Sequence, residues 1–497
     1  MTTYGRTGLV LALSAAAVAA SLTTVARAAD TGAGLDWERC GPVGLGQECA
    51  TLSVPLDYSD PDGRQVPLAV SRIRSTSPEA RRGALAVIPG GPGSSGVQRL
   101  SQKGAALTKE LGGAYDLVAM DPRGVGGSVK ASCGLDEDDR WMVNLRSWPG
   151  ADGSIDENVE RSRRIAETCL RNGGDELRSM TSANQARDLD RFRQALGEEK
   201  LSAWGVSYGT YVGAVYAQKY PQHTDRWVLD SSSDPNPKLV AQGWMRYMAQ
   251  GAEDRFPDFA AWAAHPDRAK EGLRLAERPA DVRSSILDLA ARLDREPKES
   301  TTPGVPLTGN VLRQALQNAL YADTSFAGFA QLVVAAQNPT AKPVLPGMLA
   351  APLPDTDAAI TVGVICNDVK WSGSVHSYRR AVTVDRARHP LTAGLPANIT
   401  PCSFWKAPEE KPTRITSEGP SNILMIQSLR DPSTPYAAGL KMRAALGERA
   451  RLVTVDQGGH GMYLGNGNAC GNRAVTEFLR TGVRPASDTH CANGVAD

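Results

Sequence analysis

Short apolar runs recur along the chain, separated by polar turns and by longer segments with helical spacing. The runs lie at residues 84–88, 117–120, 201–205, 227–229, 423–426 and 452–455. Each is only a few residues long and shows little alternation of polar and apolar positions. Such segments are typical of strands that are buried on both faces of a parallel sheet.

A β-hairpin is predicted before the first of these runs. Residues 51–56 and 65–74 have strand-like patterns, and Asp60, Pro61 and Gly63 lie between them. Proline fixes φ near the value that a turn needs, and glycine permits positive φ. The two segments therefore add an antiparallel pair, which brings the expected sheet to eight strands.

Helical periodicity follows several of the apolar runs. In residues 183–196 the side chains of Leu189, Phe192 and Leu196 recur on one face, and Ser182 precedes them as a candidate N-cap. Helices are also predicted at residues 208–220 and 437–446. Strands that alternate with helices predict an α/β protein, with a mostly parallel sheet and helices on both faces.

Two stretches interrupt this alternation. Residues 129–180 contain no clear strand, and residues 236–418 are mainly helical by pattern, with proline-rich joints. The longer stretch separates two strands of the sheet and is therefore expected to be an inserted helical cap domain. The predicted organisation is a signal peptide at 1–28, a first core segment at 29–235, the cap at 236–418 and a second core segment at 419–497.

The first 28 residues have the pattern of a signal peptide. Arg6 gives the positive start, residues 8–22 are apolar, and Ala26 and Ala28 are small residues at cleavage-site spacing. A membrane anchor needs a longer apolar run of about 20 residues. Cleavage would remove two arginines and change the formal charge from +1 to −1. We therefore expect a secreted, soluble protein, with no charge footprint for nucleic acid or membrane.

Eight cysteines in an exported chain suggest disulfides, because export places them in an oxidising environment. They are Cys40, Cys49, Cys133, Cys169, Cys366, Cys402, Cys470 and Cys491. Pairing nearest neighbours would close four modest loops, although eight cysteines allow about 105 pairings and sequence cannot decide among them. No pair has the spacing of a zinc knuckle.

The strongest chemical signal is the segment Gly205-Val206-Ser207-Tyr208-Gly209, a G-x-S-x-G motif between a predicted strand and a predicted helix. In this context the serine lies on a sharp turn at the sheet edge, as in the α/β-hydrolase fold. The N-terminus of the following helix favours the negative charge that develops during attack. Ser207 is therefore the expected nucleophile.

A serine nucleophile needs a base and an acid that orients the base. The six histidines are His223, His265, His376, His389, His460 and His490. His460 lies in a glycine-rich loop after the last strand run, where an imidazole can reach back over the sheet edge. Asp431 follows the run 423–426 and lies between serine and histidine in the expected chain order. Asp230, at the end of the run 227–229, is the rival acid.

Two backbone amides are expected to bind the oxyanion of the tetrahedral intermediate. Tyr208 follows the nucleophile and supplies one. Gly91, in the Pro-Gly-Gly-Pro-Gly segment after the run 84–88, is the expected second donor, with Gly90 in reserve. No metal-ligand spacing, phosphate loop or dinucleotide motif appears in the right context, so we expect neither a metal nor a cofactor.

Together these segments resemble the secreted tripeptidyl aminopeptidases of actinobacteria, in the proline-iminopeptidase branch of serine peptidases. The matching segments begin at Pro89, Asp121, Gly205, Asp431 and Gly458, and the resemblance runs from about residue 35 to the C-terminus. It implies Ser207, Asp431 and His460 as the triad, and peptide or protein N-termini as substrates from which short peptides, often tripeptides, are released. Pro89 stands where proline iminopeptidases have histidine.

An exopeptidase that binds a free amino group needs an acceptor for an ammonium ion, and a buried carboxylate is the usual one. Glu253, Asp254 and Asp368 in the cap are the candidates for this substrate-binding role. An extracellular esterase or lactone hydrolase that uses the same triad is the alternative function, since a fold does not determine a substrate. The expected oligomeric state is a monomer.

Overall fold

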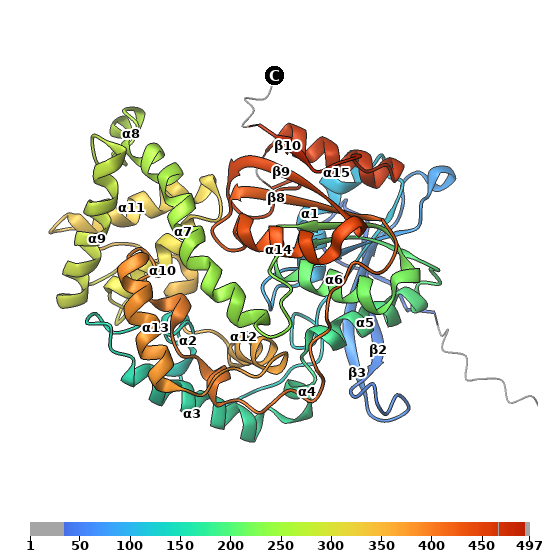
Figure 1. The fold of residues 1–497 in the computed structure, drawn as a ribbon, viewed down its shortest axis with the longest axis horizontal. Coiled ribbons are helices and arrows are strands. Elements are labelled where there is room, and N and C mark those ends of the chain that lie inside the picture. The colour runs from blue at the N-terminus through green and yellow to red at the C-terminus, as the bar shows by residue number, and fades with distance from the viewer. Residues whose placement is uncertain (1–33, 466, 493–497) are drawn as a thin grey trace, which may run out of the picture. The chain divides into compact units, whose positions relative to one another are not determined.

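A ten-stranded sheet organises the structure, a computed structural model that describes residues 34–465 and 467–492 (Figure 1). The predicted signal peptide at 1–28 lies outside the described residues. The strand order is β1-β2-β3-β5-β4-β6-β7-β8-β9-β10. The strands are β1 Glu38–Arg39, β2 Gln47–Pro55, β3 Gln65–Ile73, β4 Ala84–Ile88, β5 Asp116–Met120, β6 Leu201–Val206, β7 Thr224–Asp230, β8 Ile423–Arg430, β9 Ala450–Gly458 and β10 Thr489–Cys491.

All eight predicted strands form, and two short edge strands add to them. β2 and β3 are the expected antiparallel hairpin, and β4 to β9 pair in parallel with their neighbours, apart from the antiparallel β3–β5 contact. β1 pairs antiparallel with β2, and β10 pairs parallel with β9. Two or three residues are too few to show a hydrophobic period, which is why these edge strands escape prediction.

Helices cover both faces of the sheet, as its composition predicts. In β4 every side chain is buried, with Ala84, Ala86 and Ile88 in one hydrophobic cluster and Leu85 and Val87 in another. The first cluster includes α5 (Ser182–Ala195), α6 (Tyr208–Lys219) and α14 (Tyr436–Leu446), and the second includes α1 (Gly96–Glu110) and α15 (Ala469–Thr481). Alternation along the strand thus gives each helical layer its own core.

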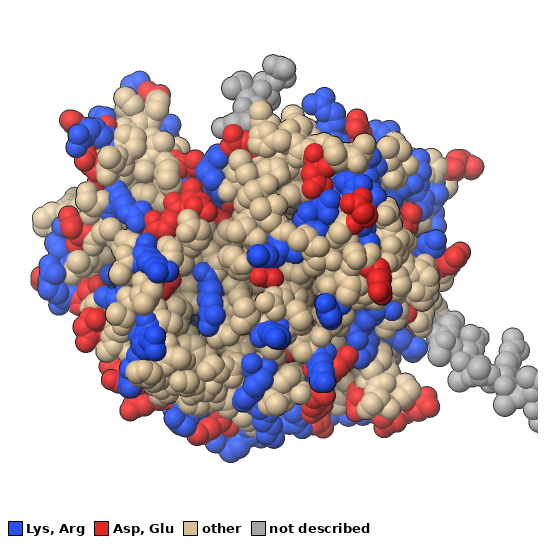
Figure 2. All heavy atoms as spheres, in the orientation of Figure 1, with Lys and Arg blue, Asp and Glu red and all other residues tan. Residues whose placement is uncertain are grey.

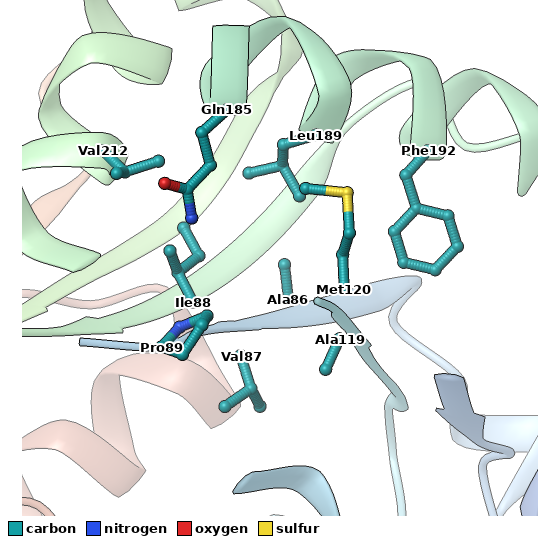
Figure 3. Close-up of a pocket in the computed structure, with 10 residues that line it drawn as sticks. All are labelled: Ala86, Val87, Ile88, Pro89, Ala119, Met120, Gln185, Leu189, Phe192 and Val212. Carbon is teal, nitrogen blue, oxygen red and sulfur yellow. The ribbon is translucent and has the colours of Figure 1, made fainter. Parts of the chain in front are cut away.

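The predicted apolar face of α5 packs against the sheet. Figure 3 shows Leu189 and Phe192 descending from this helix toward Ala86 and Met120. The cavity among these side chains is only about 10 Å³, which leaves room for about one water-sized sphere. It is therefore a packing defect and too small for a ligand.

The N-terminus of α5 differs from expectation by one residue. Thr181, with extended backbone, is the N-cap, and its hydroxyl accepts a hydrogen bond from the Asn184 amide at 3.0 Å. Ser182, the predicted cap, is the first helical residue, and its hydroxyl donates to Asp368 instead. Both residue types can cap a helix, so local sequence alone could not distinguish them.

The segment between β7 and β8 is helical, and Figure 1 shows it gathered to the left of the sheet. Its helices are α7 Val240–Ala264, α8 Asp267–Lys270, α9 Pro279–Arg295, α10 Gly309–Ala319, α11 Phe326–Gln337, α12 Asp355–Asn367 and α13 Val375–Arg388. α7, α9, α10 and α11 share a hydrophobic core of their own. α12 instead packs into the cluster beside the sheet, so the helical insertion and the sheet are joined by a common core.

The shorter irregular stretch joins the same helical region. It forms α2 (Met142–Leu145), α3 (Asp156–Asn172) and α4 (Gly174–Arg178). Ile155, at the start of α3, shares a small core with Tyr378 and Val382 of α13. Residues from two separate parts of the sequence therefore build the helical side of the molecule.

The disulfides link cysteines that are nearest neighbours in the sequence. This is the one pairing scheme that the sequence analysis named among the many that eight cysteines allow. The bonds are Cys40–Cys49, Cys133–Cys169, Cys366–Cys402 and Cys470–Cys491. The second and third lie in the helical region, where they close loops of 36 residues each. Within the described residues, no helix combines the length and apolar composition needed to cross a bilayer.

Candidate active site

Ser207 lies at the turn between β6 and α6, with φ of 59° and ψ of −126°. A positive φ is costly for a residue with a side chain, and such strain is characteristic of a nucleophile elbow. The flanking glycines are required by packing. A Cβ on Gly205 would lie 2.5 Å from the Gly209 carbonyl oxygen, and one on Gly209 would lie 2.5 Å from that of Ile88.

Asp431 and His460, which are 29 residues apart, meet at the edge of the sheet where β8 and β9 end. His460 Nδ1 is 3.0 Å from Asp431 Oδ1 and 2.9 Å from Oδ2. The amides of Ser433 and Thr434 each donate to Asp431 Oδ1 at 2.8 Å, and the Thr434 hydroxyl donates to Oδ2 at 3.1 Å. The carboxylate is fully buried, so these bonds fix its orientation and that of the imidazole.

The charge around His460 favours its protonated form. Burial alone would lower the pKa of the imidazole, but the Asp431 carboxylate against Nδ1 raises it, with a further contribution from Asp230. The net pKa lies above the ordinary value of 6.5. A more basic imidazole accepts the proton of a serine hydroxyl more readily.

Asp230, the rival acid, holds the protein backbone instead of the imidazole. Its two oxygens accept hydrogen bonds from the amides of Met462 at 2.7 Å and Tyr463 at 2.9 Å, and from the Trp204 indole at 3.2 Å. Burial raises its pKa despite these bonds. Asp230 thus anchors the segment that directly follows His460.

Tyr321, in the helical insertion, completes the surroundings of the imidazole. Its ring meets the His460 ring edge-on at a centroid distance of 5.1 Å, and its carbonyl accepts the His460 amide at 2.9 Å. The phenol donates to the Ser433 hydroxyl at 2.9 Å. No local sequence signal marks this residue, because its role depends on how the insertion packs against the sheet edge.

A cavity of about 410 Å³ opens at this edge. Ser207 and His460 line it, together with Tyr208, Gly90 and Gly91 from the predicted oxyanion segments. Side chains from α2, α7 and α12 form its helical side. The volume lies within the range of about 300–1,000 Å³ that is usual for ligand sites.

Both glycines predicted for the oxyanion site line the same cavity as the serine. A Cβ on Gly90 would lie 2.9 Å from the Ser207 Cβ, so the backbone at Gly90 packs directly against the nucleophile. Gly91 has a φ of 108°, a conformation that suits glycine. This geometry gives the reserve candidate, Gly90, the closer contact, and the donor assignment stays a prediction.

The carboxylates predicted to bind a substrate amine do not line this cavity. Glu253 pairs with Arg283 at 2.7 Å, and Asp254 accepts a hydrogen bond from Gln250. Asp368 is buried against Ser182, whose amide donates to it at 2.9 Å. Among the described residues that line the cavity there is no aspartate or glutamate. Helix orientation, which sequence did not specify, turns these side chains elsewhere.

Asp368 instead lines a separate cavity of about 700 Å³ that is rich in charges of both signs. Burial raises the pKa of its carboxyl to about 6. Its partner Ser182 also shares a hydrogen bond of 2.8 Å with the phenol of Tyr208. Ser182 therefore links Asp368 to Tyr208, the residue after the nucleophile. Asp368 itself does not line the cavity that contains Ser207.

Charged side chains of both signs lie on the face of the molecule that Figure 2 shows. Figure 2 shows lysine and arginine interspersed with aspartate and glutamate over the visible face. Within the described residues no group of three or more histidine, cysteine, aspartate or glutamate side chains gathers as a metal site would.

The sheet order, the strained serine and the aspartate–histidine pair define the class: this is a serine hydrolase with the α/β-hydrolase fold. Family models agree, since the alpha/beta hydrolase fold model matches residues 83–272 and the TAP-like protein model matches residues 392–491.

The particular family follows from full-length relatives. The chain is 33% identical to a tripeptidyl aminopeptidase of Streptomyces lividans, over 94% of this chain and 88% of that protein. It is 28% identical to serine protease Hip1 of Mycobacterium tuberculosis, over 90% of this chain and 87% of that one. Carboxylesterase B of the same organism is 29% identical, over 89% and 86%. The chain belongs to the tripeptidyl aminopeptidase family of α/β-hydrolase serine peptidases.

Proposed function

We propose that this protein is a secreted serine exopeptidase that releases short peptides, tripeptides in particular, from free N-termini. The observation that carries the proposal is the Asp431–His460 pair, which faces the same cavity as the strained Ser207. Full-length similarity to a tripeptidyl aminopeptidase supports the substrate class. The four disulfides fit an extracellular location, and we propose a monomer that acts without a cofactor.

The proposed reaction is acyl transfer in two steps. Ser207 Oγ attacks the scissile carbonyl carbon while His460 takes the hydroxyl proton, and Asp431 stabilises the resulting imidazolium. The amides of Tyr208 and of Gly91 or Gly90 bind the oxyanion. His460 then returns the proton to the leaving amine, and water, deprotonated by the same histidine, hydrolyses the acyl-enzyme to free the serine.

Ester hydrolysis is the second candidate function. A relative named carboxylesterase B aligns over 89% of the chain. None of the described residues that line the cavity is an aspartate or glutamate that could bind a substrate ammonium. Tripeptide p-nitroanilides with free and with acetylated N-termini distinguish the two functions. Cleavage of the free-amine form alone supports the exopeptidase, whereas activity confined to short acyl esters would replace it with an esterase.

Replacing the nucleophile gives the primary test. Ser207→Ala should lower kcat on the best substrate by about 10⁴- to 10⁶-fold, because the attacking hydroxyl is removed while the cavity stays intact. Ser284→Ala, at an exposed position on α9, is the matched control and should retain full activity. Comparable activity in wild type and Ser207→Ala would disprove the assignment of this serine.

A further inference from the structure

Two arginines, Arg99 and Arg146, line the cavity that contains Ser207 and His460. No aspartate or glutamate lies among the other described lining residues. The cavity wall is therefore positively charged, although the protein as a whole is nearly neutral. A wall of this charge suits an anionic group on the substrate better than a cationic one.

Arg99 has a counter-charge within the protein. Its guanidinium lies over the Trp204 ring at 4.9 Å from the centroid. Burial lowers its pKa, and the negative charge of Asp230 opposes that effect. Arg99 is thus influenced by the charge of the buried carboxylate that anchors the segment after His460.

Arg146 has no such partner in the part of the chain that the structure describes. It follows α2, and its only side-chain contact with a polar atom is between Nη1 and the Met245 sulfur at 3.9 Å. Its Nε is buried without a hydrogen bond, and it belongs to no ion pair. By contrast, Arg123 pairs with Asp188 at 2.8 Å and Arg313 pairs with Asp294 at 2.7 Å.

Arg146 also lines the same cavity as the reacting groups. Tyr321, whose ring packs on His460, has a pKa that burial raises and that the nearby Arg146 charge partly lowers. The guanidinium therefore lies on the helical side of the cavity, within electrostatic range of Tyr321. A half-buried guanidinium with free N–H groups gains charge-assisted hydrogen bonds only when an acceptor enters the cavity.

We propose that Arg146 binds a carboxylate of the substrate and so favours peptides that place a carboxylate near the cleaved bond. The inference rests on the proposed exopeptidase function and names its substrate class. The carboxylate has two possible sources: an aspartate or glutamate side chain near the cleaved bond, or the free C-terminus of a short peptide. Either would pair with the planar guanidinium through two parallel hydrogen bonds.

The experiment compares matched substrates that differ in one charge. Tripeptide p-nitroanilides carry glutamate or glutamine at each of the three positions in turn, and tetrapeptides and pentapeptides carry a free or an amidated C-terminus. Wild type should prefer the charged member of at least one pair by about tenfold or more in kcat/KM. The pair that shows the preference identifies the source of the carboxylate.

Arg146→Gln should reduce that preference to near unity while the neutral substrate keeps its kcat/KM within a few-fold. Arg146→Lys should retain part of the preference, because lysine keeps the charge and loses the fork geometry. Arg246→Gln is the control, since Arg246 is exposed on α7 and does not line this cavity. An unchanged charge preference in Arg146→Gln, or no preference in wild type, would overturn the inference.

The two proposals fail separately. Cleavage of neutral peptides without any charge preference keeps the exopeptidase and removes the role of Arg146. If no peptide is cleaved, the proposed function fails, and calorimetry of free Glu- and Gln-containing tripeptides with Ser207→Ala still decides the role of Arg146. Should Arg146→Gln not fold, the wild-type preference must weaken with added salt, and a salt-independent preference contradicts pairing with a charge.

Discussion

Two neighbouring strand ends carry the same residue in two different roles. β7 ends at Asp230 and β8 is followed by Asp431, and both carboxylates are fully buried. Asp431 turns its oxygens to the imidazole of His460, whereas Asp230 turns its oxygens to the backbone amides of Met462 and Tyr463. One carboxylate holds the ring, and the other holds the chain segment that carries the ring.

The comparison shows that burial and position do not reveal the task of an aspartate. The hydrogen-bond partners of the aspartate reveal its task. A carboxylate that faces a titrating group changes the pKa of that group, while a carboxylate that faces backbone amides only fixes geometry. In Asp431 two amides bind Oδ1, and the imidazole lies within hydrogen-bond distance of both oxygens. In Asp230 the amides and an indole occupy both oxygens.

Of the two aspartate substitutions, Asp431→Asn should give the larger effect on activity. The asparagine can keep its oxygen on the amides of Ser433 and Thr434, but its NH₂ group would then donate to His460 Nδ1. That bond places the ring proton on Nε2, where the base must be free, so kcat should fall by about 10⁴-fold. Steady-state kinetics measure the loss, and the thermal unfolding midpoint should change little by comparison.

Asp431→Glu serves as the companion variant, because it keeps the charge and shifts its position. It should recover part of the activity. Equal activity of wild type and Asp431→Asn would show that the carboxylate does not orient the base, and the contrast with Asp230 would disappear.

Asp230→Asn should act mainly on stability. Asparagine has one oxygen, so either the Met462 or the Tyr463 amide would face an NH₂ group inside the protein. An unsatisfied buried donor costs about 1–3 kcal/mol of the free energy of unfolding. Denaturant unfolding measures this cost. Activity should fall far less than in Asp431→Asn, and a loss of the same size would mean that the two carboxylates share one role.

Ser207 and His460 could be located from sequence because local patterns mark them. A glycine-flanked serine between strand and helix, and a glycine-rich loop after the last long strand, are both visible in short segments. Asp431 and Asp230 each follow a strand, so sequence could rank them only by order and loop type. The partners that distinguish them, His460 for Asp431 and the amides of Met462 and Tyr463 for Asp230, are more than twenty residues away in sequence, and no local pattern records those contacts.

The helical side was less predictable. The sequence pattern predicted that residues 236–418 are mainly helical, but the direction of each polar side chain depends on how helices pack on one another. Asp368 therefore lines a different cavity from the one expected. Arg146 lies at the end of a four-residue helix in a stretch without periodicity, where sequence gave no sign of a site.

The smallest expected effect compares the two carboxylates through the pH profile. Because Asp431 and, to a lesser degree, Asp230 raise the pKa of His460, the acid limb of kcat/KM in wild type should lie above the ordinary value of 6.5. His460 acts as a base only when neutral, so activity is lost as pH falls through this pKa. Removing a negative charge lowers the pKa and moves the limb to lower pH. The shift should be larger for Asp431→Asn than for Asp230→Asn, because Asp431 contacts the ring directly. Equal shifts of the acid limb would mean that both carboxylates affect the pKa of His460 only through their charge, without a contribution from the direct contact of Asp431.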